Sequence, residues 1–194
     1  MRQRVTGRAV RKGRPFARRM NSLKTIDTVT LERGKKSQRK ALENLAQLYM
    51  HDFNDFLEPD GKLDVGEDGR FKDDINLEAY WTKPENSVWF IRADAKLAGF
   101  ALIDTVTRSG QPADFNMAQF FVSRAYRGLE VASRAVVALL EAHPGQWEIA
   151  IMLRNAPALR FWPRAIALAS ISQLEVLPDE NGKTKRRLLR FVAG

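Results

Sequence analysis

The chain reads F-N-M-A-Q-F-F-V-S-R-A-Y-R-G-L-E-V-A-S-R-A-V-V-A-L-L-E from residue 115 to residue 141. The run 115–122 is mostly apolar and predicts a strand. Between residues 129 and 141 the apolar side chains recur every three or four positions, which predicts a helix that ends at Pro144 and Gly145. A short loop containing Arg127 and Gly128 therefore leads from a strand into a helix.

The sequence beyond this helix continues the alternation of strand and helix. Residues 147–152 (W-E-I-A-I-M) predict a strand, and residues 156–166 predict a helix that begins beside Asn155. Consecutive strand, helix and strand imply a right-handed crossover between neighbouring parallel strands. Residues 171–176 and 186–192 flank a turn at 179–182 and predict a closing hairpin.

The sequence before residue 115 predicts a helix and an antiparallel meander. Residues 28–32 predict a first strand, and residues 88–92 and 96–106 predict a hairpin that continues into the strand at 115–122. Residues 37–51 predict an amphipathic helix with Ser37 as its N-cap, and residues 52–57 and 76–81 predict two short helical turns. The apolar face of the long helix comprises Leu42, Leu45, Ala46, Leu48 and Tyr49.

Residues 58–74 are rich in Gly and Asp and predict a long, acidic surface loop. Its acidic side chains do not follow the spacing of the twelve-residue calcium loop, which ends in a glutamate. We therefore predict no metal site.

The length and composition indicate one soluble domain. The chain has 194 residues, of which 44% are hydrophobic and 28% charged, as is typical of globular proteins. No apolar run approaches the roughly 20 residues of a membrane-spanning helix, so we expect no membrane contact and a cytoplasmic location. The absence of cysteine excludes disulfides, thiolate metal sites and cysteine nucleophiles.

The net charge of +9 is concentrated at the N-terminus. Residues 1–20 contain eight basic and no acidic side chains, whereas residues 21–194 contain 24 basic and 23 acidic ones. We predict that residues 1–25 are a disordered basic extension and that residues 26–194 form the folded domain. The extension could be a solvated or non-native addition with Met20 as an alternative start, an arm that binds nucleic acid, or an organelle transit peptide.

Three segments resemble the GNAT (N-acetyltransferase) superfamily. Residues 122–135 resemble its acyl-CoA signature, which has Arg or Gln, two variable residues, Gly, one variable residue, then Gly or Ala. Residues 143–149 (H-P-G-Q-W-E-I) and 155–162 (N-A-P-A-L-R-F-W) resemble a bacterial branch of predicted acetyltransferases. The resemblance covers about residues 28–192. It implies an α/β (α+β) fold with a mixed, mostly antiparallel sheet and a parallel crossover at the cofactor site.

The resemblance also implies a site for acetyl-CoA as co-substrate. A loop that enters a helix offers free backbone N–H groups and the positive end of the helix dipole, which suit a diphosphate. The remaining positions follow the family: the backbone of two strand residues pairs with the pantetheine arm, and an asparagine bonds the same arm. The expected cofactor-binding residues are Phe121, Val122, Arg127, Gly128, Leu129, Glu130, Val131, Ala132, Ser133 and Asn155. Asn155 could instead only cap its helix.

Two positions depart from the family pattern. Glu130 stands where the signature has its first glycine, so it adds bulk and negative charge to the expected diphosphate loop. Gln119 stands where the related branch has a glutamate, and an amide cannot act as a base. Many family members have a tyrosine that protonates the leaving thiolate. This tyrosine is missing here, and Phe161 and Trp162 stand in its neighbourhood. Of the candidate catalytic residues Gln119 and Glu148, the second is interpreted first as an outward-facing strand residue.

These observations predict an N-acetyltransferase that transfers an acetyl group from acetyl-CoA to an amine by direct attack. The acceptor would be a small molecule or a peptide. The alternative is a GNAT-like acyl-CoA-binding or interaction module without catalysis, with nucleic acid as a further partner through residues 1–20. An unrelated α/β binding protein is the third interpretation.

Overall fold

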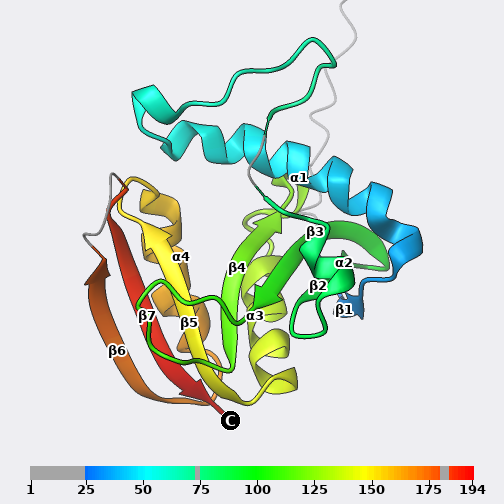
Figure 1. Ribbon diagram of the computed structural model, residues 1–194. Coiled ribbons are helices and arrows are strands. Elements are labelled where there is room, and N and C mark those ends of the chain that lie inside the picture. The colour runs from blue at the N-terminus through cyan, green and yellow to red at the C-terminus, as the bar shows by residue number, and fades with distance from the viewer. Residues whose placement is uncertain (1–24, 73–74, 180–183) are drawn as a thin grey trace, which may run out of the picture.

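The computed structural model describes residues 25–72, 75–179 and 184–194 (Figure 1). Within them one seven-stranded sheet has the order β1-β2-β3-β4-β5-β7-β6. Neighbouring strands are antiparallel except β4 and β5, which are parallel. The strands are β1 (Val29–Arg33), β2 (Ser87–Ala93), β3 (Lys96–Asp104), β4 (Phe115–Val122), β5 (Gly145–Met152), β6 (Ile171–Asp179) and β7 (Arg186–Ala193).

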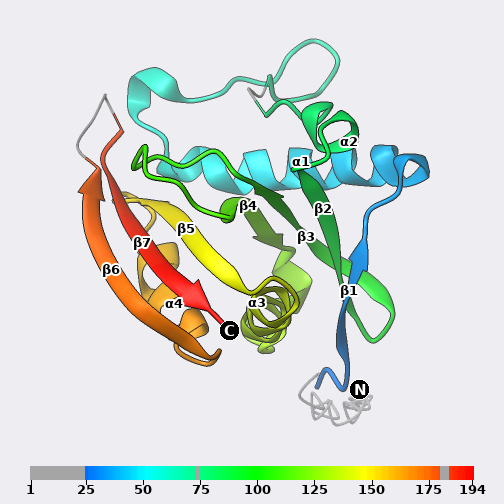
Figure 2. The same cartoon turned by 60° about the horizontal axis from the view of Figure 1, so that its bottom comes forward.

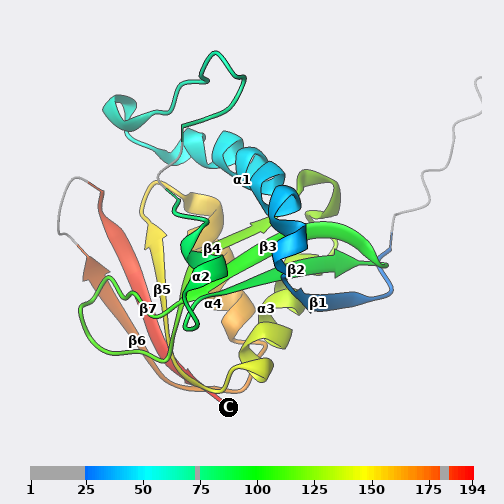
Figure 3. The same ribbon diagram turned by 45° about the vertical axis from the view of Figure 1, so that its right-hand side comes forward.

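Helices cover both faces of the sheet. Figures 2 and 3 show α1 (Arg39–Phe53) and the short α2 (Ala79–Thr82) on one face, and α3 (Val131–Ala142) and α4 (Ala156–Ile166) on the other. Each face has its own apolar core, as strand alternation requires. On the α1 face the buried side chains include Leu42, Phe90, Phe100, Leu102 and Phe121. On the α3 and α4 face they include Val136, Leu139, Trp147, Ile149, Trp162 and Phe191.

The expected α/β fold with a parallel crossover is confirmed. β4 and α4 coincide with the predicted ranges, because both carry an uninterrupted apolar pattern. The hairpin of β2 and β3 turns through Asp94 and Ala95, whose φ angles of 48° and 63° suit the twist of a tight hairpin. The order of the last strands was not predicted: β7 lies between β5 and β6, so β6 rather than β7 is the edge strand at that end of the sheet.

Two details of α1 differ from the prediction. A 3-10 turn, Lys36–Gln38, precedes the helix, so Gln38 rather than Ser37 occupies the N-cap position. Leu48 was placed on the buried face but is 54% exposed. Six residues separate it from Leu42, which corresponds to roughly 120° around the helix and puts it outside the buried face.

The segments around α1 and α2 are short helical turns and loop. The predicted turns are observed at Asn54–Phe56 and at α2, and the acidic loop contains a 3-10 turn, Pro59–Gly61, and a bridge between Val65 and Phe71. The predicted basic extension, apart from residue 25, lies outside the described residues. None of the described helices is long and apolar enough to cross a membrane. In the same residues no group of three His, Cys, Asp or Glu side chains could hold a metal ion.

Candidate acyl-donor cleft

The two parallel strands separate soon after they meet. β4 and β5 pair only at Phe115 with Trp147 and at Asn116 with Glu148. Beyond these residues β4 continues to Val122 and β5 to Met152 without pairing to each other. The sheet therefore opens toward the C-terminal ends of both strands.

A cleft of about 990 Å³ lies at this opening. Its walls come from the end of β4, the following loop, the first turn of α3, the length of α4 and the C-terminal part of α1. All the expected cofactor-binding residues line it except Leu129, which packs against the core cluster around Ile91 and Val131. The lining residues among those expected are Phe121, Val122, Arg127, Gly128, Glu130, Val131, Ala132, Ser133 and Asn155.

The loop before α3 presents free main-chain donors. Within the described residues, the amides from Gly128 to Ser133 have no hydrogen-bond acceptor, whereas the Arg127 amide donates to the Arg124 carbonyl at 3.2 Å. The first amide of α3 with a helical partner belongs to Arg134, which donates to the Glu130 carbonyl at 3.0 Å. A run of free amides at a helix N-terminus is a binding site for an anion.

Two left-handed residues shape this loop. Gly128 has a φ of +73° and Glu130 a φ of +58° with ψ near 4°. Glu130 is the N-cap of α3, yet its side chain makes no capping bond and is exposed. A residue other than glycine is disfavoured in this conformation. Glu130 therefore replaces the glycine of the family signature at a position whose positive φ favours glycine.

Arg127 ties the loop to α1 and to β4. Its guanidinium donates to Asp52 at 2.6 Å and to the Val122 carbonyl at 2.9 Å, and it lies 5.7 Å from the centre of the Phe121 ring. Arg124 donates to the same carboxylate at 2.7 Å. One of the backbone groups expected to meet the pantetheine arm is therefore already engaged within the protein.

Asp52 is held as a carboxylate by these contacts. Partial burial raises its pKa, but hydrogen bonds from Arg124, His51 and Arg127 lower it by more, so the pKa lies below its ordinary value. Asp52 thus balances one of the two positive charges of Arg124 and Arg127. Farther along, Glu58 pairs with Arg154 at 3.0 Å, so the segment between residues 52 and 58 is fixed beside the ends of both β4 and β5.

Gln119 lies on the α1 face of β4 and is bonded to Tyr49. The Tyr49 hydroxyl donates to the Gln119 side-chain oxygen, and burial raises the pKa of Tyr49 far above its ordinary value. Tyr49 lines the cleft, whereas Gln119 does not. Neither side chain is a base at neutral pH.

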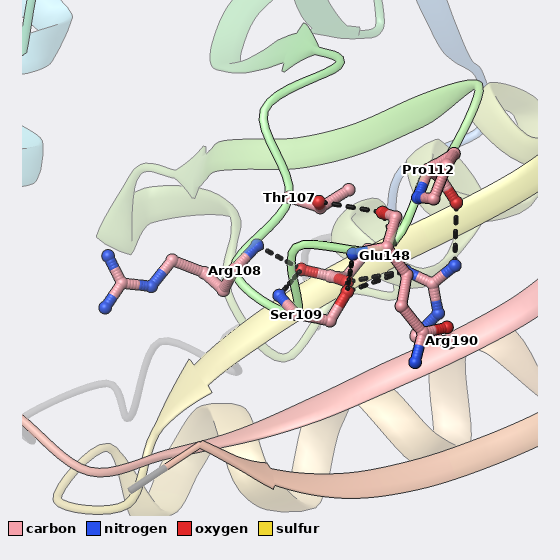
Figure 4. Close-up of polar contacts among 7 residues, drawn as sticks. Thr107, Arg108, Ser109, Pro112, Glu148 and Arg190 are labelled. Carbon is pink, nitrogen blue, oxygen red and sulfur yellow. Dashed lines mark hydrogen bonds and ion pairs between the residues drawn. The ribbon is translucent and has the colours of Figure 1, made fainter. Parts of the chain in front are cut away.

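Glu148 is buried, so its interpretation as an outward-facing residue was wrong. Its side chain is fully excluded from solvent, because the loop between β3 and β4 covers it (Figure 4). Figure 4 shows its carboxylate accepting from the Ser109 hydroxyl, from the amide of Arg108 at 2.5 Å and from Arg190 at 2.7 Å. Burial raises its pKa, and hydrogen bonds from Ser109, Arg190 and the loop amides lower it by more.

This network fixes the loop rather than the cleft. Arg190 also donates to the Pro112 carbonyl at 2.8 Å, and Figure 4 shows both charged side chains beneath the loop. Glu148 does not line the cleft, and its carboxylate is occupied by donors. The arrangement stabilises the loop over β5 and β7.

Asn155 and the aromatic pair of α4 complete the cleft. Asn155 caps α4, because its side-chain oxygen accepts from the Ala158 amide at 3.0 Å, and it lines the cleft as well. Phe161 stacks on Phe120 with ring centres 6.0 Å apart, and Trp162 is buried beside them. The predicted helix cap is therefore confirmed.

Sequence reasoning did not find several cleft residues, among them Tyr49, Asp52, Arg160 and Arg164. Asp52 was assigned only to a helical turn, and its partners lie 72 and 75 residues away in sequence. The arginines repeat at a spacing of four on α4, which was the available signal for a shared face.

Comparison with solved structures gives neighbours of the same fold. A spermidine N-acetyltransferase from Vibrio cholerae, solved with CoA and spermine, has a TM-score of 0.56 at 12% identity over 85% of this chain and 95% of its own. An acetyltransferase from Thermus thermophilus has a TM-score of 0.59 at 11% identity over 86% and 99%. NAA60 from Arabidopsis thaliana, solved with a bisubstrate analogue, has a TM-score of 0.52 at 14% identity over 85% and 98%. No curated protein matches the sequence.

The sequence itself matches one family. The model of the acetyltransferase (GNAT) family aligns with residues 42–166, which include most of α1, the opening between β4 and β5, α3 and α4. Members of this family use acetyl-CoA, and the free amides before α3 and the cleft along α4 fit such a ligand. The chain belongs to the GNAT acetyltransferase family.

Proposed function

We propose that the protein is an N-acetyltransferase that transfers the acetyl group of acetyl-CoA directly to an amine. The observation that carries this proposal is the run of unpartnered amides from Gly128 to Ser133, which opens into the cleft between β4 and β5. A helix N-terminus with several free amides is an arrangement that suits a diphosphate.

Different residues of the cleft would bind different parts of acetyl-CoA. The amides from Gly128 to Ser133 would bind the diphosphate, and the end of β4 with Asn155 would hold the pantetheine arm. The negative charge of Glu130 opposes this binding, but its side chain is exposed to solvent. Phe120 and Phe161 would exclude water from the thioester.

The reaction forms a bond between the amine nitrogen and the acetyl carbon and breaks the carbon–sulfur bond. The amine must lose a proton and the thiolate must gain one. Glu148 is occupied by donors, Gln119 cannot take a proton, and burial raises the pKa of Tyr49. We therefore propose that this chain acts by orienting amine and thioester, with water carrying the proton.

The acceptor would approach from the α1 face. The cleft wall on that side carries Phe53, Phe56 and the exposed carboxylate of Asp55, and the acidic 58–74 loop adds further negative charge. This surface favours a cationic amine, as in the Vibrio cholerae relative solved with spermine. A cytoplasmic location and contact with nucleic acid through residues 1–20 stay predictions.

A second candidate function is acyl-CoA binding without transfer. The observation that favours it is that β4 and β5 offer no free carboxylate for proton transfer. Glu148 is paired with Arg190, and the position on β4 is an amide, Gln119, which is bonded to Tyr49. The donor site would then serve recognition alone.

Calorimetry and a turnover assay separate these functions. Acetyl-CoA is titrated into the protein, and release of free CoA is then followed with a panel that includes spermidine, benzylamine and a peptide with a free N-terminus. Micromolar binding with amine-dependent release supports transfer, and micromolar binding without release supports the second candidate. Absence of binding refutes both.

A further inference from the structure

α4 presents two arginines to the cleft. Arg160 and Arg164 are separated by one helical turn, so they lie on the same side of α4. Both line the cleft that contains the free amides before α3, and both are exposed. The cleft follows α4 from Pro157 to Ala165, a length of roughly 12 Å, so it has room for a ligand with two separated groups.

These arginines differ from the other two in the cleft. Arg124 and Arg127 donate to Asp52 at 2.7 and 2.6 Å. Arg160 and Arg164 have no hydrogen-bond or ion-pair partner within the residues that the structure describes. Like charges at this spacing destabilise a helix modestly, so the pair is better suited to a bound anion than to the helix alone.

The nature of the anion follows from the chemistry of the guanidinium group. Its planar donors match the oxygens of a phosphate and form charge-assisted bonds that are stronger than neutral ones. Under the proposed function, the diphosphate would take the free amides from Gly128 to Ser133 as its donors. A pair of free arginines elsewhere in the same cleft calls for a second, terminal phosphate.

We infer that Arg160 and Arg164 bind the 3′-phosphate of coenzyme A and make the protein selective for CoA over 3′-dephospho-CoA. The inference rests on the proposed function, because it assigns the donor to this cleft. It adds that α4 recognises the nucleotide end of the donor through charge, while the loop before α3 recognises the diphosphate through its main chain.

The test compares CoA, 3′-dephospho-CoA and adenosine 3′,5′-bisphosphate by calorimetry. The proteins are the wild type, Arg160→Ala, Arg164→Ala, the double variant and Arg187→Ala. Arg187 is an exposed arginine of β7 outside the cleft, so its variant controls for loss of one positive charge. Thermal melting of each variant checks the fold.

The wild type should bind CoA at least about tenfold more tightly than 3′-dephospho-CoA. Each cleft variant should weaken CoA about threefold and 3′-dephospho-CoA very little, so that the double variant loses about tenfold and binds both cofactors about equally. The bisphosphate should lose affinity in the same variants, which separates the 3′-phosphate from the pantetheine arm.

Equal binding of both cofactors by the wild type would overturn the inference and leave the proposed function standing. An equal loss in Arg187→Ala would also overturn it, because the effect would then be one of total charge. If the wild type binds neither CoA nor 3′-dephospho-CoA, the proposed function and the inference are both refuted.

Discussion

Replacing Glu130 by glycine should both stabilise the protein and tighten its binding of CoA. Glu130 has a φ of +58° at the N-cap of α3, a conformation that costs an L-residue about 1–2 kcal/mol. Glycine removes this cost but gives the unfolded chain about 0.5–1 kcal/mol more conformational entropy. Loss of the exposed carboxylate from the helix N-terminus costs about 0.3 kcal/mol more, so the net gain in the free energy of unfolding should be about 0.5 kcal/mol, measured by urea denaturation.

The effect of Glu130→Gly on binding comes from charge. A carboxylate at a helix N-terminus competes with a bound anion for the same dipole, an effect of about 0.3–1 kcal/mol for one charge and more for a diphosphate. CoA binding should therefore tighten by about three- to tenfold in calorimetry at low salt. The gain should shrink at high salt, since the charge is exposed.

Two variants separate backbone strain from charge. Glu130→Gln keeps the left-handed residue and removes the charge, so it should tighten CoA binding without stabilising the fold. Glu141→Gln removes an exposed charge near the other end of α3, roughly 16 Å away, and should change neither quantity. If Glu130→Gly leaves both stability and affinity unchanged, this loop is not the diphosphate site and its strain has no cost.

Three further predictions concern the loop over β5 and the packing beside the cleft. Glu148→Gln should cost about 3 kcal/mol of unfolding free energy in urea, because Arg190 would lose its buried partner. The pKa of Glu148 is lowered in the folded state, so its contribution to the free energy of unfolding should be full above about pH 4.3 and lost as the pH falls below that value. Urea denaturation at about pH 3 and pH 7 should therefore show a smaller pH dependence in the variant than in the wild type. Gly99→Ala should destabilise the protein by about 3 kcal/mol, since a Cβ there would lie 2.0 Å from the Phe121 carbonyl oxygen. The control Gly61→Ala should not destabilise it, because no atom lies within 4 Å of the added Cβ. Equal melting temperatures of the two variants would contradict this packing. Tyr49→Phe should cost about 1–2 kcal/mol in urea by leaving the Gln119 oxygen unsatisfied, and an unchanged midpoint would mean that the bond contributes nothing.

The sequence predicted the elements whose pattern is local. β4 and α4 follow from uninterrupted apolar periodicity, and the loop before α3 follows from a strand that runs into a helix within a few residues. The expected cleft residues come together for the same reason, because they lie at the ends of adjacent elements. Leu129 is the exception, since one residue of a loop can turn into the core while its neighbours face outward.

The contacts that fix the cleft could not be predicted in the same way. Arg127 meets Asp52 across 75 residues and Arg190 meets Glu148 across 42, so neither pair leaves a local pattern. The burial of Glu148 depends on a loop that folds over β5, and alternation along the strand gives no sign of that loop. The position of β7 inside the sheet is likewise set by pairing between distant strands.

A crystal structure of the protein with CoA would examine the diphosphate site itself. We expect diphosphate oxygens about 3 Å from two or more of the amides between Gly128 and Ser133, with the pantetheine arm in the opening between β4 and β5. A diphosphate bound elsewhere, with these amides left facing solvent, would contradict the assignment of the donor to this cleft.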